Sequence, residues 1–464
     1  MSHASFKNRA TSTLQSAYID LATLEGNSKR LYAGAECTTP FSRDIEKSSW
    51  FTTMWSPLKA ENASADSPVW KAAKSADFLL DVLIRGDVPA VRVKPEFAKK
   101  GYEIAWTPYF GHNWAGHVEQ QFNDLKGQTF DSTYLDHHAN LFTKGYDKWI
   151  LYNKVVGNTE EATSFAQKLN GFSVKQPLPF TFTKSPPDAL KLCCLKLVDV
   201  KFAFQLQNDL ARLLRVRRPA GKNRDGSVQY EYLGGDNSDY VDFEGKSAKV
   251  KNIECWGKYG MVTDEERDFH KSETHSIVME QSLNYDHVQP QVGTGTVNAP
   301  FHWNGAVKAI MFGAVNKTSE KLNHFSNYTT DTHDRANGRD PIKTVTLQYD
   351  SQFRFQNLPA DVFSEIELLK GNFNGTPDVG HHVHTYSLDP SSSAPNGSTT
   401  YDRLMASVMI DIEDRNVVDT DENEREVKLS LPNEYHFEMR GISEVVYLVQ
   451  NNSISVPVGG DSSD

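Results

Sequence analysis

Apolar and polar residues alternate with a period of two at several places along this chain. The clearest segments are residues 200–206, 345–349 and 408–412. Because successive side chains of a strand point to opposite faces, each segment predicts a strand with one apolar face. Turn-forming residues gather between such segments, at 185–186, 234–235 and 391–398. The sequence therefore predicts an all-β fold of sandwich or barrel type.

Helical patterns are few and short. Asn158 is suited to cap a helix that places Phe165 and Leu169 on one face and stops at Gly171. A second candidate covers residues 359–369, with apolar side chains at helical spacing. We expect both helices to be insertions between strands.

A polar, glycine-rich stretch over 216–250 divides the chain into two strand-rich parts. The 464 residues suffice for two eight-stranded jelly rolls, since one jelly roll with long loops takes roughly 150–220 residues. The expected order is an N-terminal arm (1–30), a first jelly roll (31–215), a linker (216–250), a second jelly roll (251–455) and a C-terminal tail (456–464).

The charge balance argues against wrapping nucleic acid. Lys and Arg number 49 and Asp and Glu 60, which gives a net charge of −11. One basic run stands out, formed by Arg212, Arg215, Arg217, Arg218, Lys222 and Arg224. It lacks interleaved aromatic residues, so we interpret it as a solvated or inter-subunit loop and expect no direct nucleic-acid partner.

Nothing in the sequence predicts secretion or a membrane span. The first residues lack the apolar core of a signal peptide. The longest apolar run, Ala309 to Val315, is far below the ~20 residues that a membrane span needs. We therefore expect the four cysteines to be reduced thiols: Cys37, Cys193, Cys194 and Cys255. Six N-x-S/T sites are interpreted as turn asparagines, although their glycosylation stays open: Asn62, Asn316, Asn327, Asn374, Asn396 and Asn451.

The search for catalytic motifs finds no nucleophile elbow, no zinc-protease motif and no phosphate-binding loop. Two histidine groups could hold a metal, namely 137–138 and 381–384, but neither has a third ligand at fixed spacing. For 381–384 the alternative is a polar strand edge. We assign no catalytic, cofactor-binding or metal-binding residues, and we expect no cofactor and no enzymatic activity.

Short motifs distributed over nearly the whole chain resemble one family. They are YIDLATLEGNSKRLYAG (18–34), WFT (50–52), DFLLDVLIRGDVPAV (77–91), FNDL (122–125), GYD (145–147), PLPFTFT (177–183), MVTDEER (261–267), SNYTT (326–330), YSLDP (386–390) and NGSTTYDRL (396–404). In this order they are similar to the major capsid proteins of nucleocytoplasmic large DNA viruses, above all iridovirus-like and marseillevirus-like members.

The resemblance implies a double jelly roll, a homotrimer with a pseudo-hexagonal outline, and an icosahedral capsid. It also implies a late protein that is made and assembled in the host cytoplasm, with minor capsid and penton proteins as partners. The segment before Tyr18 would lie beneath the capsomer, facing minor capsid proteins or the inner membrane. The loops 216–250 and 370–385 are candidates for the outer surface.

Six aromatic side chains are then expected to fill the sandwich interiors: Trp50, Phe51, Phe180, Phe182, Phe202 and Phe204. Two other functions stay open from the residues alone. A carbohydrate-binding β-sandwich would explain the aromatic residues and the N-x-S/T sites. A cupin-like metalloenzyme would use histidines inside a jelly roll.

Overall fold

The computed structural model describes residues 50–62, 64–222, 228–272, 274–285, 289–350, 352–371, 373, 377–401, 406–414 and 432–456, and the backbone of 418–420 and 426–428. The chain divides into two compact units, Met1–Trp50 and Phe51–Asp464, and the account below concerns the second. The arm predicted over 1–30 and nearly all of the tail predicted over 456–464 lie outside the described residues.

Two sheets form a first sandwich. One has the order β1–β16–β4–β10, with β11 also on β4, and the other has the order β2–β3–β12–β7–β8. Their bounds are β1 Phe51–Pro57, β2 Lys59–Asn62, β3 Val69–Lys71, β4 Phe78–Val88, β7 His117–Phe122, β8 Leu125–Asp131, β10 Phe172–Pro177, β11 Leu190–Lys191, β12 Val200–Gln205 and β16 Lys251–Val262. The strand predicted around 200–206 is confirmed as β12, with Val200, Phe202 and Phe204 buried.

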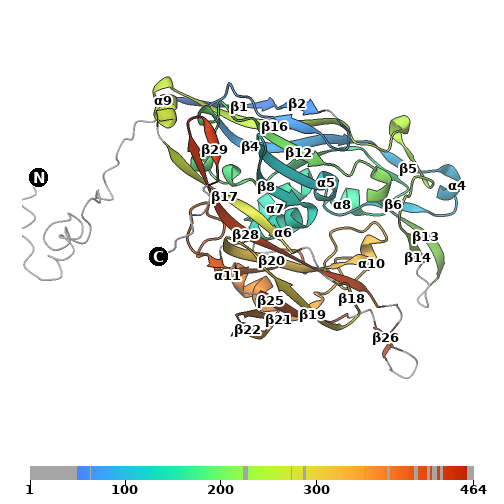
Figure 1. The fold of residues 1–464 in the computed structure, drawn as a ribbon. Coiled ribbons are helices and arrows are strands. Elements are labelled where there is room, and N and C mark those ends of the chain that lie inside the picture. The colour runs from blue at the N-terminus through green and yellow to red at the C-terminus, as the bar shows by residue number, and fades with distance from the viewer. Residues whose placement is uncertain are drawn as a thin grey trace, which may run out of the picture. The chain divides into compact units, whose positions relative to one another are not determined.

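Two three-stranded sheets extend this sandwich, with the orders β14–β13–β6 and β15–β5–β9. Their bounds are β5 Val91–Val93, β6 Glu103–Trp106, β9 Lys168–Leu169, β13 Leu214–Lys222, β14 Val228–Leu233 and β15 Val241–Phe243. The strands β5, β6, β13 and β14 lie together at the right of Figure 1.

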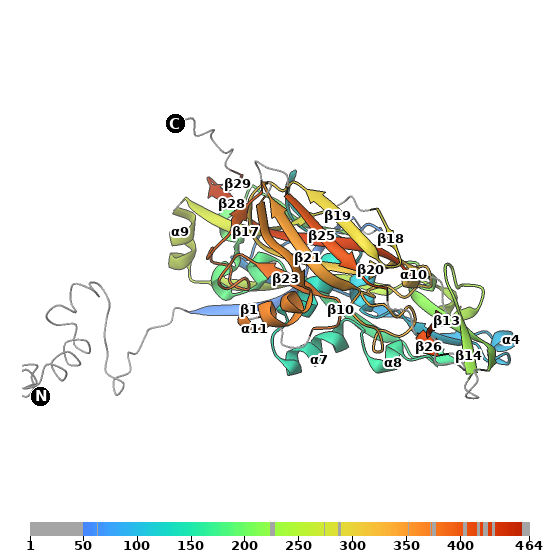
Figure 2. The same cartoon turned by 90° about the horizontal axis from the view of Figure 1, so that it is seen from below.

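Two further sheets form a second sandwich. One has the order β17–β28–β20–β23, with β18, β24 and β29 on its flanks, and the other has the order β19–β25–β21–β22. Their bounds are β17 His275–Asn284, β18 Gln291–Val292, β19 Gly295–Phe301, β20 Ala306–Asn316, β21 Ile342–Tyr349, β22 Gln352–Pro359, β23 His382–Thr385, β24 Thr399–Thr400, β25 Ala406–Ile412, β28 Glu434–Gln450 and β29 Ser453–Ser455; β26 Val418–Thr420 and β27 Glu426–Lys428 pair separately. Figure 2 shows β19, β25 and β21 in front of β20 and β28. The strands predicted around 345–349 and 408–412 are confirmed as β21 and β25.

The sheet containing β20 is buried on both faces. Ala309 and Met311 point into the first hydrophobic core, whereas Ile310, Phe312 and Ala314 point into the second. In Figure 1 this sheet runs between the strands of the first sandwich above and those of the second sandwich below. A strand covered on both faces needs a continuous apolar run, which explains the longest apolar segment of the sequence.

Short helices fill the connections between strands. The α-helices are α4 Pro95–Ala98, α5 Phe110–Ala115, α6 Ser132–Phe142, α7 Tyr146–Val155, α8 Glu160–Thr163, α9 Asp264–Ser272, α10 Lys317–Glu320 and α11 Glu367–Lys370; single turns of 3₁₀-helix are η1 Thr181–Thr183, η2 Pro186–Asp188, η3 Leu192–Cys194, η4 Leu210–Leu213 and η5 Glu244–Lys246, and η6 Val362–Ile366 is a π-helix. The helix predicted over 359–369 corresponds to η6 and α11. Sequence reasoning missed α6 and α7, although the Asp131 side chain caps α6 by accepting a hydrogen bond from the Tyr134 amide (2.7 Å).

The helix predicted over 158–171 is wrong beyond its first turn. Ser164 already has extended backbone angles, and Leu169 pairs with Val91 in the β5–β9 ladder. Ala166 likewise forms a bridge with Ile104. Pairing with distant strands therefore overrides the local helical pattern.

The region predicted as a linker, 216–250, contains strands that pair with strands of the first half of the chain. Within it, β13 pairs with β6, and β15 pairs with β5. The next strand, β16, was expected in the second jelly roll but lies between β1 and β4 of the first sandwich. The change from one sandwich to the other falls at α9. The polar composition of this region fits exposed strands as well as a loop, since the second half of β13 and most of β14 are exposed or half-buried.

The aromatic core prediction is confirmed for Phe180, Phe182, Phe202 and Phe204, which are buried. It is wrong for Trp50 and Phe51, whose exposed fractions are 64% and 66%. Phe51 begins β1, which is the end strand of its sheet among the described residues, and nearly all side chains of β1 are exposed.

Candidate functional site

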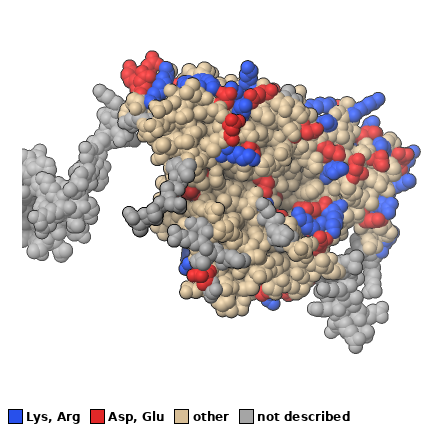
Figure 3. Space-filling view, viewed as in Figure 1, with Lys and Arg blue, Asp and Glu red and all other residues tan. Residues whose placement is uncertain are grey.

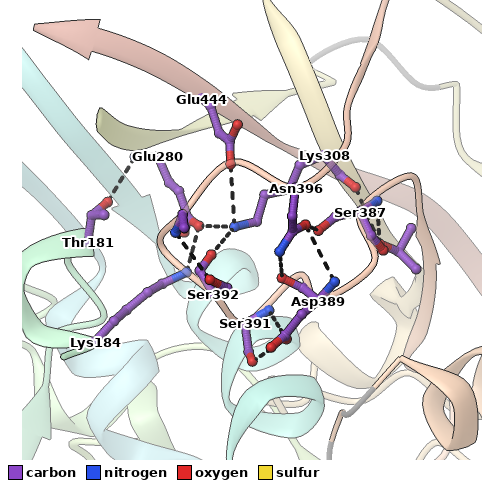
Figure 4. Close-up of polar contacts among 12 residues, drawn as sticks. Thr181, Lys184, Glu280, Lys308, Ser387, Asp389, Ser391, Ser392, Asn396 and Glu444 are labelled. Carbon is purple, nitrogen blue, oxygen red and sulfur yellow. Dashed lines mark hydrogen bonds and ion pairs between the residues drawn. The ribbon is translucent and has the colours of Figure 1, made fainter. Parts of the chain in front are cut away.

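A buried group of charges joins the two sandwiches (Figure 4). Glu280 of β17 and Glu444 of β28 stand directly opposite each other, an arrangement that is unfavourable for like charges. The ammonium group of Lys308 lies 2.5 Å from Glu280 Oε1 and 3.8 Å from Glu444 Oε1. Lys184, just after η1 of the first sandwich, lies 2.6 Å from the same oxygen of Glu280. Two cations thus compensate two facing carboxylates.

A bulge aims Lys308 at this group. The pairing of β20 with β28 shifts register between Val307 and Ala309, so Lys308 is the extra residue on its strand. Its ammonium also donates a hydrogen bond to the carbonyl oxygen of Ser392 (2.7 Å). Lys308 therefore connects β17, β28 and the 387–396 loop, which is drawn around it in Figure 4.

Burial and charge act in opposite directions on these groups. Burial tends to raise the pKa of Glu280, but Lys184 and Lys308 outweigh it and hold that pKa below its usual range. Burial lowers the pKa of Lys184, although Glu280 opposes the shift. Burial raises the pKa of Glu444, which has the more distant cation. We call the group of Lys184, Glu280, Lys308 and Glu444 the charged junction. Within it, Glu280 is the carboxylate that the two lysines keep ionised.

Of the histidines singled out in the sequence, His137, His381 and His382 are buried, whereas His138 and His384 are half-buried. His382 and His384 lie on β23, the end strand of its sheet. His137 of α6 and His381, next to β23, approach with their Nδ1 atoms 2.8 Å apart. His382 Nε2 lies 2.7 Å from Asp340 Oδ2, and His384 Nδ1 lies 3.3 Å from Glu367 Oε1. Burial lowers the pKa of His138 to about 3. Among the residues that the structure describes, no group of three or more His, Cys, Asp or Glu side chains is placed to hold a metal ion.

Sequence reasoning missed a second buried polar network, around Asp136 of α6. His112 Nδ1 lies 2.6 Å from Asp136 Oδ1, and its Nε2 lies 2.7 Å from the Tyr152 hydroxyl. Tyr328, from the second half, donates to Asp136 Oδ2 (3.2 Å). These residues are far apart in sequence, and only the helical placement of Asp136 could have indicated an inward-facing carboxylate. Like the lysine–glutamate group, this network joins the two halves.

The N-x-S/T sites differ in accessibility. The side-chain amide groups of Asn316 and Asn327 are buried and donate to Thr329 O (3.0 Å) and Asp331 O (2.7 Å), as expected of turn asparagines. Asn62 and Asn451 are exposed, and Asn396 is half-buried. Asn374 lies outside the described residues. Of the four cysteines, Cys193, Cys194 and Cys255 are free thiols, as expected, and Cys37 is not described.

Most of the basic run lies on a strand and not on a loop: Arg215, Arg217, Arg218 and Lys222 are residues of β13, and Arg212 lies in η4. Whether this region lies between subunits stays a prediction. Arg217 of β13 is paired with Glu103 (2.6 Å), and Arg218 with Glu231 (2.7 Å). Arg224 lies outside the described residues. On the face seen in Figure 3, acidic and basic side chains are interspersed, and most of the described surface is uncharged. No single-sign patch covers this face.

Large apolar side chains are exposed at several places, and two of these lie on regular elements, β1 and α7. Phe51, Met54 and Trp55 of β1 have exposed fractions of 66%, 50% and 45%. On α7, Tyr146 and Ile150 are exposed one helical turn apart. Exposed apolar groups of this kind are typical of surfaces that another molecule covers. The structure thus combines a firmly connected interior with uncovered apolar surfaces. No helix among the described residues is long and apolar enough to cross a membrane.

Comparison with known proteins identifies the family. A family model described as "Major capsid protein N-terminus" matches residues 39–261, and one described as "Large eukaryotic DNA virus major capsid protein" matches residues 266–453. The chain belongs to this major capsid protein family. The gap between the two matches falls at the start of α9, where the strand pairing also changes from one sandwich to the other.

Curated capsid proteins are similar over most of their length. The major capsid protein of Costelytra zealandica iridescent virus is 27% identical over 85% of this chain and 87% of the relative. That of Lymphocystis disease virus 1 (isolate Darai) is 26% identical over 97% of this chain and 99% of the relative. The iridovirus-like resemblance is confirmed, and the chain is a structural capsid protein of a large DNA virus, with its place in the virion shell.

Solved structures show the same fold. The quasi-atomic model of the PBCV-1 virus capsid aligns with a TM-score of 0.67 at 13% identity, covering 91% of this chain and all of its own. The Faustovirus major capsid protein aligns with a TM-score of 0.67 at 10% identity, covering 89% and 93%. The predicted double jelly roll is confirmed. This family is a family of capsid structural proteins and not of enzymes.

Proposed function

We propose that three copies of this capsid protein form a capsomer with a pseudo-hexagonal outline, and that such capsomers tile an icosahedral shell. The observation that carries the proposal is the presence of two sandwiches in one chain. Three such chains around a three-fold axis present six similar sandwiches, which approximates hexagonal symmetry.

The exposed apolar surfaces support association between copies. Phe51, Met54 and Trp55 lie on β1, and none of the described strands pairs with the outer edge of this strand. Covering these side chains in a trimer would remove apolar area from water, worth ~25 cal/mol per Å². The interior networks around Glu280 and Asp136 would keep the two sandwiches of each copy in fixed register while the trimer forms.

Light scattering on the purified full chain tests the proposal, with negative-stain images of the same peak. A trimer has three times the chain mass of 52.2 kDa, or about 157 kDa, and a three-fold or hexagonal outline. A stable, compact monomer at micromolar concentration in physiological salt would overturn the proposal of self-assembling trimers.

Further partners follow from the same proposal. We propose that minor capsid and penton proteins are its neighbours in the shell. The segment before Tyr18 would face these proteins or an inner membrane. Assembly would take place in the host cytoplasm. The test is limited proteolysis. We expect slower cleavage of residues 1–30 in intact particles than in free trimers, and equal rates would contradict the buried position of this arm.

The division into domains is also a proposal. We propose that the first jelly roll extends through Val262 and that α9 connects it to the second, which begins at His275. Supporting this division, β16 pairs with β1 and β4, whereas β17 pairs with β28. Protease cleavage at α9 should leave two fragments that remain associated, because the sheet containing β20 contributes to both cores.

A further inference from the structure

Part of the basic run lines a cavity that the capsid function does not explain. The cavity has a volume of about 750 Å³, and its lining includes residues of α8, β13, β14 and the 329–336 and 377–379 segments. Arg215 and Arg217, two residues apart on β13, share one face of the strand and line it together with Arg335. Cavities of this size hold small molecules in other proteins.

Arg215 is a buried cation that has no carboxylate partner. Its exposed fraction is 6%, and among the described residues no acidic oxygen lies within 4 Å of its guanidinium group. Its guanidinium group donates a hydrogen bond from Nη2 to the carbonyl oxygen of His333 (2.8 Å). Burial lowers the pKa of Arg215 to about 10, so the group stays charged at neutral pH. Asp334 attracts this group from a distance without forming an ion pair with it. A buried charge with no paired anion is costly, which points to a missing anion.

The other charges at the cavity are already engaged or lie at its edge. Arg217 is paired with Glu103, and Arg335 with Asp378. The carboxylate of Asp334 accepts hydrogen bonds from the Ala336 amide (3.0 Å) and the Asn337 side chain (2.9 Å). Glu160 is exposed in the first turn of α8. These acids moderate the positive charge of the cavity, but none of them pairs with Arg215.

Aromatic rings form part of the wall. Two guanidinium groups lie over the ring of Phe165, with Cζ of Arg215 at 4.8 Å and Cζ of Arg217 at 4.1 Å from its centroid. Tyr232 stacks on His333 with ring centroids 3.9 Å apart. The wall therefore places aromatic side chains beside the unpaired cation, and the cavity has more room than a single phosphate group occupies.

We propose that this cavity binds a small phosphorylated molecule, whose phosphate oxygens pair with Arg215 and whose organic part lies along Phe165 and Tyr232. The planar guanidinium group matches two phosphate oxygens at once, which makes arginine well suited to this contact. Because the site draws on both β13 and the 329–336 segment, the bound molecule would also tie the two halves of the chain together. The proposal goes beyond the trimer proposal and does not depend on it.

Isothermal titration calorimetry on the full chain in physiological salt tests the site with two probes, inorganic tripolyphosphate and ATP. We expect saturable binding of both with one site per chain, and tighter binding of ATP because its base adds a contact with the aromatic wall. Arg215→Gln should weaken binding at least about tenfold, since a charge-assisted contact is lost. Equal affinity for the two probes would overturn the part of the proposal that concerns the organic portion of the ligand.

Arg218→Gln is the matched control. It removes the same charge from the same strand, but its side chain points to the opposite face and pairs with Glu231. We expect its affinity to stay within about twofold of the unchanged protein, because exposed ion pairs contribute little. An equal loss in both variants, or no saturable binding by the unchanged protein, would overturn the proposal.

A second substitution covers the case in which Arg215→Gln does not fold. Arg215→Lys keeps the positive charge and loses the planar two-oxygen contact, so binding of both probes should weaken by a smaller factor than in Arg215→Gln. Circular dichroism and the melting temperature establish that each variant is folded. A folded Arg215→Lys or Arg215→Gln protein with unchanged affinity for both probes would contradict the assigned contact.

Discussion

The strands β20 and β1 are both rich in apolar side chains but lie in opposite surroundings. Phe312 of β20 packs into the second core with 3% of its surface exposed, whereas Phe51 of β1 is 66% exposed. β20 has partners on both edges, β28 and β23, whereas within the described part of the chain β1 pairs with β16 alone. The comparison shows that apolar composition alone does not distinguish a strand buried in the core from an exposed strand at the edge of a sheet.

The same substitution in both strands gives the largest expected contrast. Phe312→Ala should lower the free energy of unfolding by ~3–5 kcal/mol, since it leaves a cavity in the second core. Phe51→Ala should change it by less than about 0.5 kcal/mol in the monomer, because the ring is already in water. Urea denaturation of the monomeric form measures both values. Similar losses would mean that β1 is covered within the single chain.

Removing one charge from the charged junction should lower the stability of the folded chain. Glu280→Gln leaves Lys184 and Lys308 without their shared carboxylate, and removing one partner of a buried ion pair costs ~3–5 kcal/mol. Glu231→Gln, which breaks the exposed pair with Arg218, is the control and should cost less than about 1 kcal/mol. If the two variants had equal stability, the junction would not be a stabilising feature.

Acid should weaken the contact between α6 and the segment next to β23. Burial holds the pKa values of His137 and His381 well below the usual value. Below about pH 6.5 these histidines bind protons in the unfolded chain but not in the folded chain. The free energy of unfolding therefore decreases as the pH is lowered, by up to ~1.4 kcal/mol per pH unit for each histidine.

Denaturation at pH 7.5, 6.5 and 5.5 measures this slope, in a range above the acid titration of Glu280. The variant His381→Gln removes one of the two titrating groups and should reduce the slope, although His138 and His324 contribute in the same direction. An unchanged slope would mean that His381 takes up its proton in the folded protein.

The exposed edge should affect assembly more than folding. Trp55→Ser should leave the free energy of unfolding within about 0.5 kcal/mol of its original value, because the side chain is 45% exposed and lies on an edge strand. It should shift the trimer toward monomer in light scattering if β1 is covered in the capsomer. Tyr146→Ser on α7 provides a second exposed position for comparison. A trimer unaffected by either change would place the contact surface elsewhere.

Several features were predictable because they depend on neighbouring residues. Period-two alternation identified β12, β21 and β25, since side-chain direction in a strand is fixed by the backbone alone. The helix over 158–171 failed for the opposite reason, because strand pairing of Ala166 and Leu169 with distant residues overrides the local pattern. Within 216–250, β13 and β15 likewise pair with strands more than 100 residues earlier in the chain.

The sequence by itself determined the all-β class, the presence of two sandwiches and the resemblance to viral capsid proteins, because alternation, length and ordered motifs can be read along the chain. Only the tertiary structure decided which apolar strands are covered, where the sandwiches divide, and that Lys184, Glu280 and Lys308 meet. The exposure of Phe51 and the unpaired charge of Arg215 are likewise features that only the tertiary structure decided. Burial and pairing are properties of residues that are distant in sequence, and their energies depend on which side chains the fold brings together.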